Sequence, residues 1–376
     1  MVDAARSKIG AADLWVVKIG SALLTDMQSG IDEQGIRDWC RQIAELSKSG
    51  RSIVLVSSGA VAEGWRRLGF SGRPATVHEV QAAAAVGQMG LVEAYENAFK
   101  GHGMRTGIVL LTHDDLADRG RYLNARTTLR TLMSLGVVPV INENDSVATD
   151  EIKLGDNDTL AAMVASLLGA DVLVLLTDQD GLHERDPRED PTAPLVAHAL
   201  ATDSKLDAMA GTGRGRFGRG GMITKLAAAR RAARSGTHTV IANGRRADVL
   251  LGLSRGEVIG TFLEADVEPL VARKRWIADQ LRSSGEVRLD AGAVAAIRGQ
   301  GVSLLAVGVV AAHGDFRRGD MVRVTGPDGA EVAKGLVNYD ATETRKLLGA
   351  KSEEIELRLG YVDESELIHR DNLFVF

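Results

Sequence analysis

The sequence predicts an α/β protein whose main domain is a mainly parallel sheet sandwiched by helices. Six short apolar runs rich in β-branched and aliphatic residues are expected to be strands: Leu14–Ile19, Ile53–Val56, Gly107–Leu111, Val137–Ile141, Val172–Leu176 and Thr239–Ala242. Amphipathic stretches separate them: Glu33–Ser49, Val77–Phe99, Tyr122–Leu135, Thr159–Leu168 and Met222–Ser235. Strands that alternate with helices form βαβ units, which build a parallel sheet covered on both faces.

A change of pattern near Leu270 predicts a second, smaller domain. The charged segment VARKRWIADQLRSSG ends in Ser-Ser-Gly, as linkers often do. From Glu286 onward, VRLDAGAVAAI, SLLAVGVVAA, DMVRVTGPDG and EVAKGLVNY alternate apolar with small or polar residues around turn sequences. We therefore expect a first domain over residues 1–270, a linker over 271–284, and a small β-rich domain over 285–376.

The composition excludes several classes of protein. The net charge of −5 offers nothing to attract a polyanion or an anionic membrane. The one cysteine, Cys40, excludes an intrachain disulfide and fits a small core position in a helix. The eight histidines show no metal-ligand spacing. The first twelve residues carry charges, and no run approaches the ~18 apolar residues of a membrane span. We expect a cytoplasmic protein with no membrane partner and no metal site built from its own side chains.

An acidic segment between Val137 and Leu160 is the strongest functional signal. The expected strand ends in Asn142-Glu143-Asn144-Asp145, and Asp156-Asn157-Asp158 opens the next helix. α/β proteins place ligands at the carboxyl ends of strands and the amino ends of helices. Carboxylates repel anions, so this cluster suits an ammonium group or a metal held between phosphates. The alternative is a solvated loop with an Asx turn and an N-cap.

Four further segments carry residue types that bind nucleotides or anions. They are Lys18 followed by Gly20-Ser21, the turn Ser57-Ser58-Gly59-Ala60, the pair Thr177-Asp178 after an apolar strand, and Lys225 at the start of a helix. A lysine or free backbone N–H groups at such positions can meet a phosphate or a carboxylate. For each segment there is a structural alternative: a solvated strand end, a serine N-cap, or a glycine-rich linker.

The glycine-rich loop before Lys225 matches a dinucleotide-binding pattern only superficially. Residues 213–218, GRGRFG, fit GxGxxG, but the preceding segment KLDAMAG is polar and helical rather than a strand. The P-loop pattern is absent as well. The loop is therefore not evidence for a Rossmann domain.

Five motifs taken together resemble the amino acid kinase family. They are KIGSALL, VSSGAVAEG, INENDSVATDEIKLGDND, LLTDQDGL and GGMITK, in this order. The NEND and GDND pair resembles the members that phosphorylate glutamate, and residues 285–376 resemble a PUA domain. The resemblance implies a phosphotransferase that converts ATP and L-glutamate to ADP and L-glutamyl 5-phosphate, the first step of proline biosynthesis. It also implies ATP as co-substrate, Mg²⁺ bound mainly through the phosphates, and a homo-oligomer.

The resemblance also implies roles for individual residues. Lys18, Lys225 and one of Asp156 and Asp158 are expected to be catalytic, with the aspartate orienting the lysines. Ser58, Asp145 and Asn157 are expected to bind glutamate, Asp145 through the α-ammonium group. The expected ATP-binding residues are Lys18, Thr177, Asp178, Arg219, Gly220, Gly221, Met222, Ile223, Thr224 and Lys225. Thr159 and Leu160 are expected to be structural.

The residues can be checked against the chemistry of this reaction. A glutamate side chain has a reference pKa of ~4.3, so the nucleophile is already ionised at neutral pH and needs no general base. Accordingly, the sequence shows no His or Cys constellation. The barrier is electrostatic and geometric, because an anion must approach a polyphosphate in line. Two lysines can compensate that charge.

Two other functions remain as alternatives. A PUA-like domain invites RNA binding, but residues 286–376 hold 11 Lys and Arg against 15 Asp and Glu and show no aromatic stacking series. We therefore favour a structural or regulatory role for that domain. The second alternative keeps the kinase fold and changes the acceptor to another amino acid or a carbamate.

Overall fold

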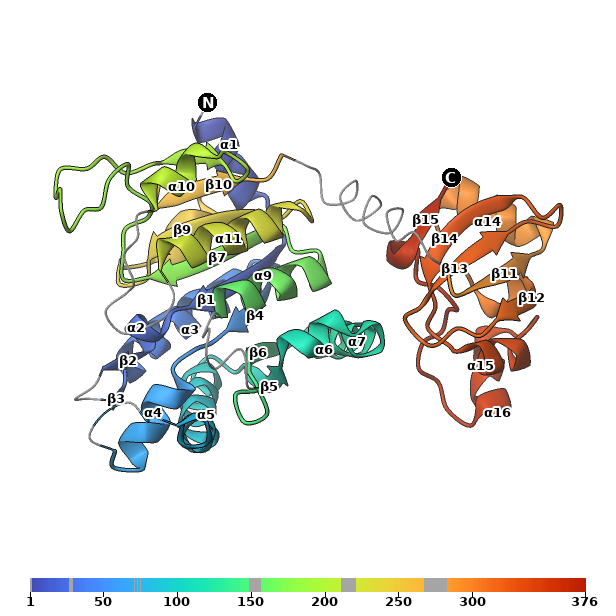
Figure 1. Cartoon of the computed structure of the whole chain (residues 1–376), viewed down its shortest axis with the longest axis horizontal. Coiled ribbons are helices and arrows are strands. Elements are labelled where there is room, and N and C mark those ends of the chain that lie inside the picture. The colour runs from blue at the N-terminus through green and yellow to red at the C-terminus, as the bar shows by residue number, and fades with distance from the viewer. Residues whose placement is uncertain are drawn as a thin grey trace. The chain divides into compact units, whose positions relative to one another are not determined.

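An eight-stranded sheet organises the first part of the chain. The computed structural model describes residues 2–26, 30–70, 72, 74, 76–148, 157–210, 221–266 and 283–376. The chain divides into two compact units, Met1–Leu116 with Arg126–Pro269, and Ala117–Ala125 with Leu270–Phe376. The sheet strands of the first unit are β1 (Leu14–Ile19), β4 (Ser52–Val56), β5 (Arg105–Leu111), β6 (Val137–Glu143), β7 (Val172–Thr177), β8 (His198–Leu200), β9 (His238–Asn243) and β10 (Thr261–Glu264) (Figure 1).

The strand order is β5-β6-β4-β1-β7-β9-β10-β8. The pairs from β5 through β9 are parallel, and β10 runs antiparallel to β9. A small hairpin of β2 (Thr25–Asp26) and β3 (Gly30–Ile31) lies outside this sheet. Because the central strands are parallel, their carboxyl ends lie at one edge of the sheet, and the predicted polar segments follow these ends.

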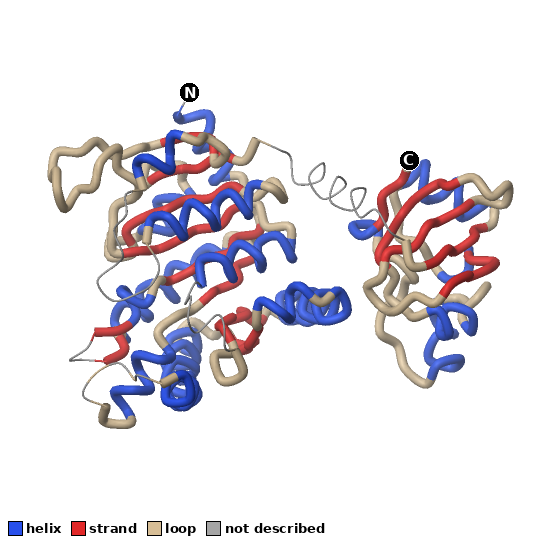
Figure 2. The backbone as a smooth tube through the Cα atoms, viewed as in Figure 1, coloured by secondary structure: helices blue, strands red, loops and turns tan. Residues whose placement is uncertain are grey.

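Helices cover both faces of the sheet (Figure 2). In chain order up to residue 266 they are α1 (Val2–Gly10), α2 (Ser21–Leu24), α3 (Glu33–Lys48), α4 (Ala60–Arg67), α5 (Val77–Lys100), α6 (His113–Ala117), α7 (Arg119–Ser134), α9 (Asn157–Leu168), α10 (Lys205–Met209), α11 (Met222–Ala233) and α12 (Val249–Ser254). Side chains alternate along β1: Trp15, Val17 and Ile19 pack with α3 and α12, whereas Lys18 reaches α9 on the other face. The alternation therefore separates an apolar face from the face that carries the ligand-type residues.

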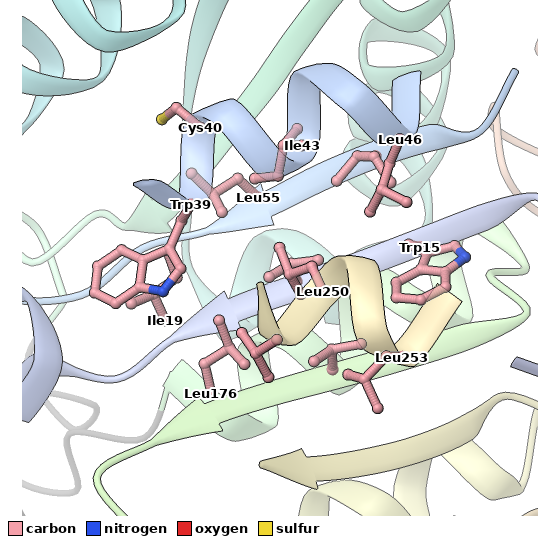
Figure 3. Packing of buried hydrophobic residues seen from close by; sticks show 14 of the residues in the cluster. Trp15, Ile19, Trp39, Cys40, Ile43, Leu46, Leu55, Leu176, Leu250 and Leu253 are labelled. Carbon is pink, nitrogen blue, oxygen red and sulfur yellow. The ribbon is translucent and has the colours of Figure 1, made fainter. Parts of the chain in front are cut away.

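The core under α3 and α12 is almost entirely apolar. Figure 3 shows side chains of both helices packed against the central strands: Trp15, Ile19, Trp39, Cys40, Ile43, Leu46, Leu55, Leu176, Leu250 and Leu253. Cys40 is fully buried there, as predicted. Its pKa is raised because burial disfavours the thiolate, so this thiol is a core residue rather than a nucleophile.

Helices α4 and α5 lie closer to each other than helices with larger side chains could. A Cβ added at Gly64 would lie 1.6 Å from the carbonyl oxygen of Ala83, and one at Gly87 would lie 1.8 Å from that of Ala60. Glycine at both positions therefore lets the two backbones touch. This contact fixes α4, which begins directly after Ser58.

The second unit contains a five-stranded sheet in the order β12-β11-β13-β14-β15. Its elements are β11 (Gly285–Leu289), α14 (Ala291–Gln300), η1 (Ala306–Gly308), β12 (Val309–Gly314), β13 (Met321–Thr325), β14 (Glu331–Leu336), α15 (Ala341–Lys346), η2 (Ser352–Glu354), α16 (Ile355–Leu359), η3 (Arg370–Asn372) and β15 (Leu373–Val375). Val287, Phe316, Val324 and Tyr339 belong to a core of its own. The β-rich domain was thus predicted correctly.

The predicted fold class is confirmed, and the differences are local. All six predicted strands are present, and β6 extends two residues further, through Asn142 and Glu143. The edge strand β8 and its neighbour β10 were missed because three or four residues are too few to show a strand period. The segment AGAVAAI, which we grouped with the β-rich pattern, belongs to helix α14, capped by the Asp290 side chain. Most of the predicted linker, residues 271–282, lies outside the described residues.

The close α4–α5 contact can be tested by replacing Gly87 with alanine. We expect Gly87→Ala to lower the melting temperature, because overpacking costs about 1–3 kcal/mol. The matched control is Gly299→Ala in α14, where no heavy atom lies within 4 Å of the new Cβ. Alanine there should stabilise the helix by up to ~1 kcal/mol. Scanning calorimetry of both variants measures this, and an unchanged melting temperature for Gly87→Ala would contradict the proposed contact.

Candidate functional site

A buried carboxylate lies between two lysines at the centre of the sheet edge. The Nζ of Lys18, near the end of β1, donates to Oδ1 of Asp158 at 2.7 Å, and the Nζ of Lys225 on α11 donates to Oδ2 at 3.1 Å. Thr224 donates its hydroxyl to the same Oδ2 at 3.0 Å. Asp158 is 1% exposed, Lys18 6% and Lys225 8%. Three elements far apart in the sequence therefore meet at one carboxylate.

The charge state of this cluster follows from its contacts. Burial by itself raises the pKa of Asp158, but the nearby ammonium groups of Lys18 and Lys225 outweigh burial and lower it well below the usual range. Asp158 also lies in the first turn of α9, where the helix dipole favours a negative charge. Among the residues that the structure describes, the cluster therefore holds two ammonium groups and one carboxylate, a balance that suits an anion.

An amide network lies beside this cluster. The Nδ2 of Asn157 is 2.7 Å from the carbonyl oxygen of Ser57, 3.0 Å from Oδ1 of Asn142 and 3.2 Å from Oγ of Ser58. Asn142 in turn donates to Oε1 of Gln88 on α5 at 2.8 Å. An amide nitrogen has two hydrogens, so the three acceptors of Asn157 share them. The network ties the start of α9 to the ends of β4 and β6.

The turn between β4 and α4 leaves a helix terminus open. Gly59 is the N-cap of α4 with φ of 90°, a conformation that favours glycine, and no side chain caps this helix. The alternative of an ordinary serine N-cap is therefore wrong. Helix α11 likewise begins at Gly221 without a side-chain cap. By contrast, Asp32 and Thr76 cap α3 and α5. Within the described residues, no side chain caps the starts of α4 and α11, an arrangement suited to an anion.

A cavity of about 250 Å³ opens where β7 ends and α11 begins. It is lined by Thr177, Asp178, Gln179, Gly181, Leu182, His183, Arg185, Asp186, Pro187, Arg188, Met209, Ala210, Gly221, Met222 and Lys225. Thr177 donates its hydroxyl to Asp178 at 3.1 Å. The cavity adjoins the Lys18–Asp158–Lys225 cluster, because Lys225 lines the cavity and also belongs to the cluster.

The sequence-predicted residues fall into three groups. The structure brings together Lys18, Asp158, Lys225 and Thr224, it places Ser58 against Asn157, and it places Thr177, Asp178, Gly221 and Met222 around the cavity. Asp145 lies in the turn after β6, and the side chain of Ile223 is half exposed and does not line the cavity. Asp156, Arg219 and Gly220 lie outside the described residues.

Some residues of the site were not singled out from the sequence. Gln88 supports the amide network from the middle of α5, and Arg185 and Arg188 line the cavity from the loop after β7. Asn142 was noted as part of a motif without a role. Only its place at the end of a strand could have indicated that Asn142 takes part in the amide network.

Two classes of feature are absent from the described part of the chain. The residues that the structure describes include no group of three His, Cys, Asp or Glu side chains arranged to hold a metal ion. Among the same residues, the helices are all too short or too polar to cross a membrane.

Comparison with known proteins agrees with this geometry. Residues 13–243 match the model of the amino acid kinase family, and residues 285–359 match that of the PUA domain. A protein of Thioalkalivibrio sulfidiphilus named glutamate 5-kinase is 59% identical over 368 residues, 98% of each chain. Proteins of the same name from Stutzerimonas stutzeri and an Azoarcus species are 58% and 57% identical, covering 98% of this chain and 100% of theirs.

These similarities extend over 98% of the chain and therefore include both units. A match of this identity and coverage leaves the family in no doubt. The chain belongs to the amino acid kinase family, within the group of proteins named glutamate 5-kinase, and carries a PUA domain after its kinase fold.

Proposed function

We propose that the protein transfers the γ-phosphoryl group of ATP to the side-chain carboxylate of L-glutamate. The products are ADP and L-glutamyl 5-phosphate, and the reaction opens proline biosynthesis. The observation that carries the proposal is the buried Lys18–Asp158–Lys225 cluster, in which two ammonium groups meet one carboxylate at the edge of the sheet, as far as the described residues show. We infer that glutamate is the acceptor from the names of the relatives.

The acceptor side is built from Ser58, Asn157 and Asp145. The Oγ of Ser58 accepts from Asn157, so its own hydrogen can point to a carboxylate oxygen of the substrate. Asp145 provides a negative charge for the α-ammonium group. The nucleophilic carboxylate is ionised at neutral pH, since the reference pKa of glutamate is ~4.3. These residues therefore need only hold and orient glutamate.

The nucleotide side is the cavity between β7 and α11. Thr177 and Asp178 contact the nucleoside, and the segment 219–225 follows the phosphates, with Gly221 and Met222 at the open start of α11. Asp158 is already paired with both lysines, so it has little capacity left for a metal. Mg²⁺ accompanies ATP through phosphate oxygens, as is common for this ion.

The two lysines act on the transferring phosphoryl group. Charge on its oxygens is stabilised by Lys18 from one side and Lys225 from the other, while Asp158 holds both ammonium groups in place. Burial strengthens these interactions, because few water molecules screen them. Asp158 is thus a positioning residue, and Asp156 remains a second candidate for that role.

The reaction class and the acceptor can be tested in one assay. Acceptor-dependent ADP release is measured with glutamate, aspartate, N-acetylglutamate, carbamate and UMP, with hydroxylamine present to trap an acyl phosphate as the hydroxamate. We expect ADP release and hydroxamate with glutamate alone. Release with another acceptor and none with glutamate would refute the proposed substrate.

Removing Lys225 should impair the chemical step. We expect Lys225→Ala to lower kcat by at least roughly 10²–10³-fold while the KM for glutamate changes little, because the ammonium acts on the transition state. The control is Lys205→Ala, an exposed lysine on α10. Steady-state kinetics of both variants measure these changes. Near-wild-type turnover of Lys225→Ala would show that α11 is not part of the active site.

Replacing Asp145 should affect the acceptor. Asp145→Asn keeps the shape and removes the charge, and a charge-assisted hydrogen bond contributes roughly 1.5–3 kcal/mol. We therefore expect the KM for glutamate to rise about ten-fold to over a hundred-fold, with the KM for ATP nearly constant. Asp328→Asn, in a turn of the second unit, is the control. If the KM for ATP rises instead, Asp145 belongs to the nucleotide side.

Asp158 should also contribute a pH-dependent part of stability. Its pKa is lowered in the folded protein, so its contribution is fully present above the unfolded value of ~3.9 and is lost as the pH falls toward the lower folded value. We expect urea unfolding between pH 6 and pH 3 to show a smaller loss of stability for Asp158→Asn than for the wild type. The variant should be less stable at pH 6, since it leaves two buried ammonium groups without a carboxylate. If the free energies of unfolding of the wild type and Asp158→Asn fall by the same amount between pH 6 and pH 3, Asp158 does not have this role.

We further propose that catalysis belongs to residues 1–270, joined by 271–284 to a structural or regulatory domain over 285–376, in a cytoplasmic homo-oligomer. All proposed site residues lie before the linker. A chain that ends at Ser284 should therefore fold and phosphorylate glutamate, although its regulation can change. A truncated protein with a native circular dichroism spectrum and no kinase activity would show that the division is wrong. Binding of an RNA oligonucleotide by the full chain, lost on truncation, would favour the RNA-binding alternative.

A further inference from the structure

A second cavity, of about 370 Å³, lies between α3, α4 and α5, apart from the residues proposed for catalysis. Its charged and polar lining comes from Glu33 and Arg37 of α3, from Glu63, Arg66 and Arg67 of α4, and from Glu93 and Asn97 of α5. Figure 1 shows α4 and α5 side by side in the first unit.

The arginines of α4 are fixed by a buried carboxylate. Glu63 is 1% exposed and accepts from Nε and Nη2 of Arg66 at 3.0 and 2.7 Å, and from Nε of Arg67 at 2.6 Å. Burial raises the pKa of Glu63, but the hydrogen bonds from Arg66 and Arg67 outweigh it and lower the pKa. Two guanidinium groups are therefore held by one carboxylate of the same helix, while the described lining of the cavity as a whole holds three guanidinium groups and three carboxylates.

Most N–H groups of these arginines remain available to a ligand. A guanidinium carries five N–H donors. Within the described part of the chain, Arg66 uses Nε and one N–H of Nη2, and Arg67 uses Nε alone. Both side chains line the cavity, and each is partly exposed, 43% for Arg66 and 37% for Arg67, so a ligand can reach them from solvent.

Glycines make room for both arginines. A Cβ at Gly90, within the long helix α5, would lie 2.5 Å from Nη2 of Arg67, and one at Gly30 would lie 2.5 Å from Nε of Arg66. Glycine inside a helix costs about 1 kcal/mol relative to alanine. Gly90 is thus an unfavourable helix residue, and its missing side chain leaves room for the end of the Arg67 side chain.

We propose that this cavity binds a small oxyanion of the hydrogen phosphate type, either free phosphate or a phosphate monoester. Two guanidinium groups with unused donors match the oxygens of a tetrahedral anion. Glu93 lines the same cavity and has no ion-pair partner among the described residues. Hydrogen phosphate keeps one hydrogen at neutral pH and can donate it to this carboxylate, whereas a phosphate monoester can do so only as its monoanion, below its second pKa of ~6. Sulfate has no such hydrogen, so Glu93 repels it.

Calorimetric titration of the full chain tests the site. Inorganic phosphate, methyl phosphate, sulfate and acetate are titrated while a nonhydrolysable ATP analogue with Mg²⁺ fills the nucleotide side. We expect phosphate to bind at one site per chain and sulfate at least about ten-fold more weakly. The comparison of methyl phosphate with inorganic phosphate distinguishes the two sources of the ligand. Absence of binding for both phosphates would overturn the proposal.

Two variants locate the binding. Arg67→Gln leaves Glu63 paired with Arg66 and should weaken phosphate roughly ten-fold to a hundred-fold. Gly90→Ala should weaken it as well, since the new methyl group displaces Arg67 without removing its charge. The control is Arg255→Gln, whose guanidinium pairs with Glu257 outside the cavity. Unchanged phosphate affinity in both cavity variants would refute the site. If one of them fails to fold, unchanged affinity in the other refutes it.

The role of Glu93 gives an independent measurement. Glu93→Gln removes the repulsion of sulfate and should bring the affinities for sulfate and phosphate within a few-fold of each other. If the wild type binds sulfate as tightly as phosphate, the proposed discrimination by Glu93 is wrong, and the site does not select hydrogen phosphate.

Discussion

The first unit depends on one electrostatic arrangement, a buried carboxylate between two buried ammonium groups. Removing two lysines from water is costly, and Asp158 offsets that cost through short hydrogen bonds to both. The arrangement can form only where β1, α9 and α11 converge. The parallel sheet provides that point, because β1 ends beside β4 and β7 in register.

In the proposed function, the same sheet edge separates the two substrates. Nucleotide-type residues follow β7 and open α11, whereas acceptor-type residues follow β4 and β6 and open α9. The lysines lie at the boundary between the two groups. A phosphoryl group passing from one side to the other would therefore always remain near positive charge, which is the main requirement of a transfer between anions.

The sequence predicted the parts of the site that depend on position along a strand or helix. Lys18 at a strand end and Lys225 at a helix start could be recognised because the pattern of elements was clear. Asp156 and Asp158 could not be separated, since residues two apart at a helix start point to different faces and only packing decides which face meets the sheet. Gln88 could not be found, because its partner Asn142 is 54 residues away and nothing local marks it.

The contact of α4 with α5 has a consequence for substrate discrimination. Because their backbones touch at Gly64 and Gly87, the turn at Ser58 is anchored to a helix of 24 residues before any ligand arrives. A preorganised turn loses little conformational entropy on binding, so more of the interaction energy appears as affinity. It also adapts little to an acceptor of the wrong length. Rigidity of this helix pair would thus limit the length of the acceptor that the proposed site accommodates.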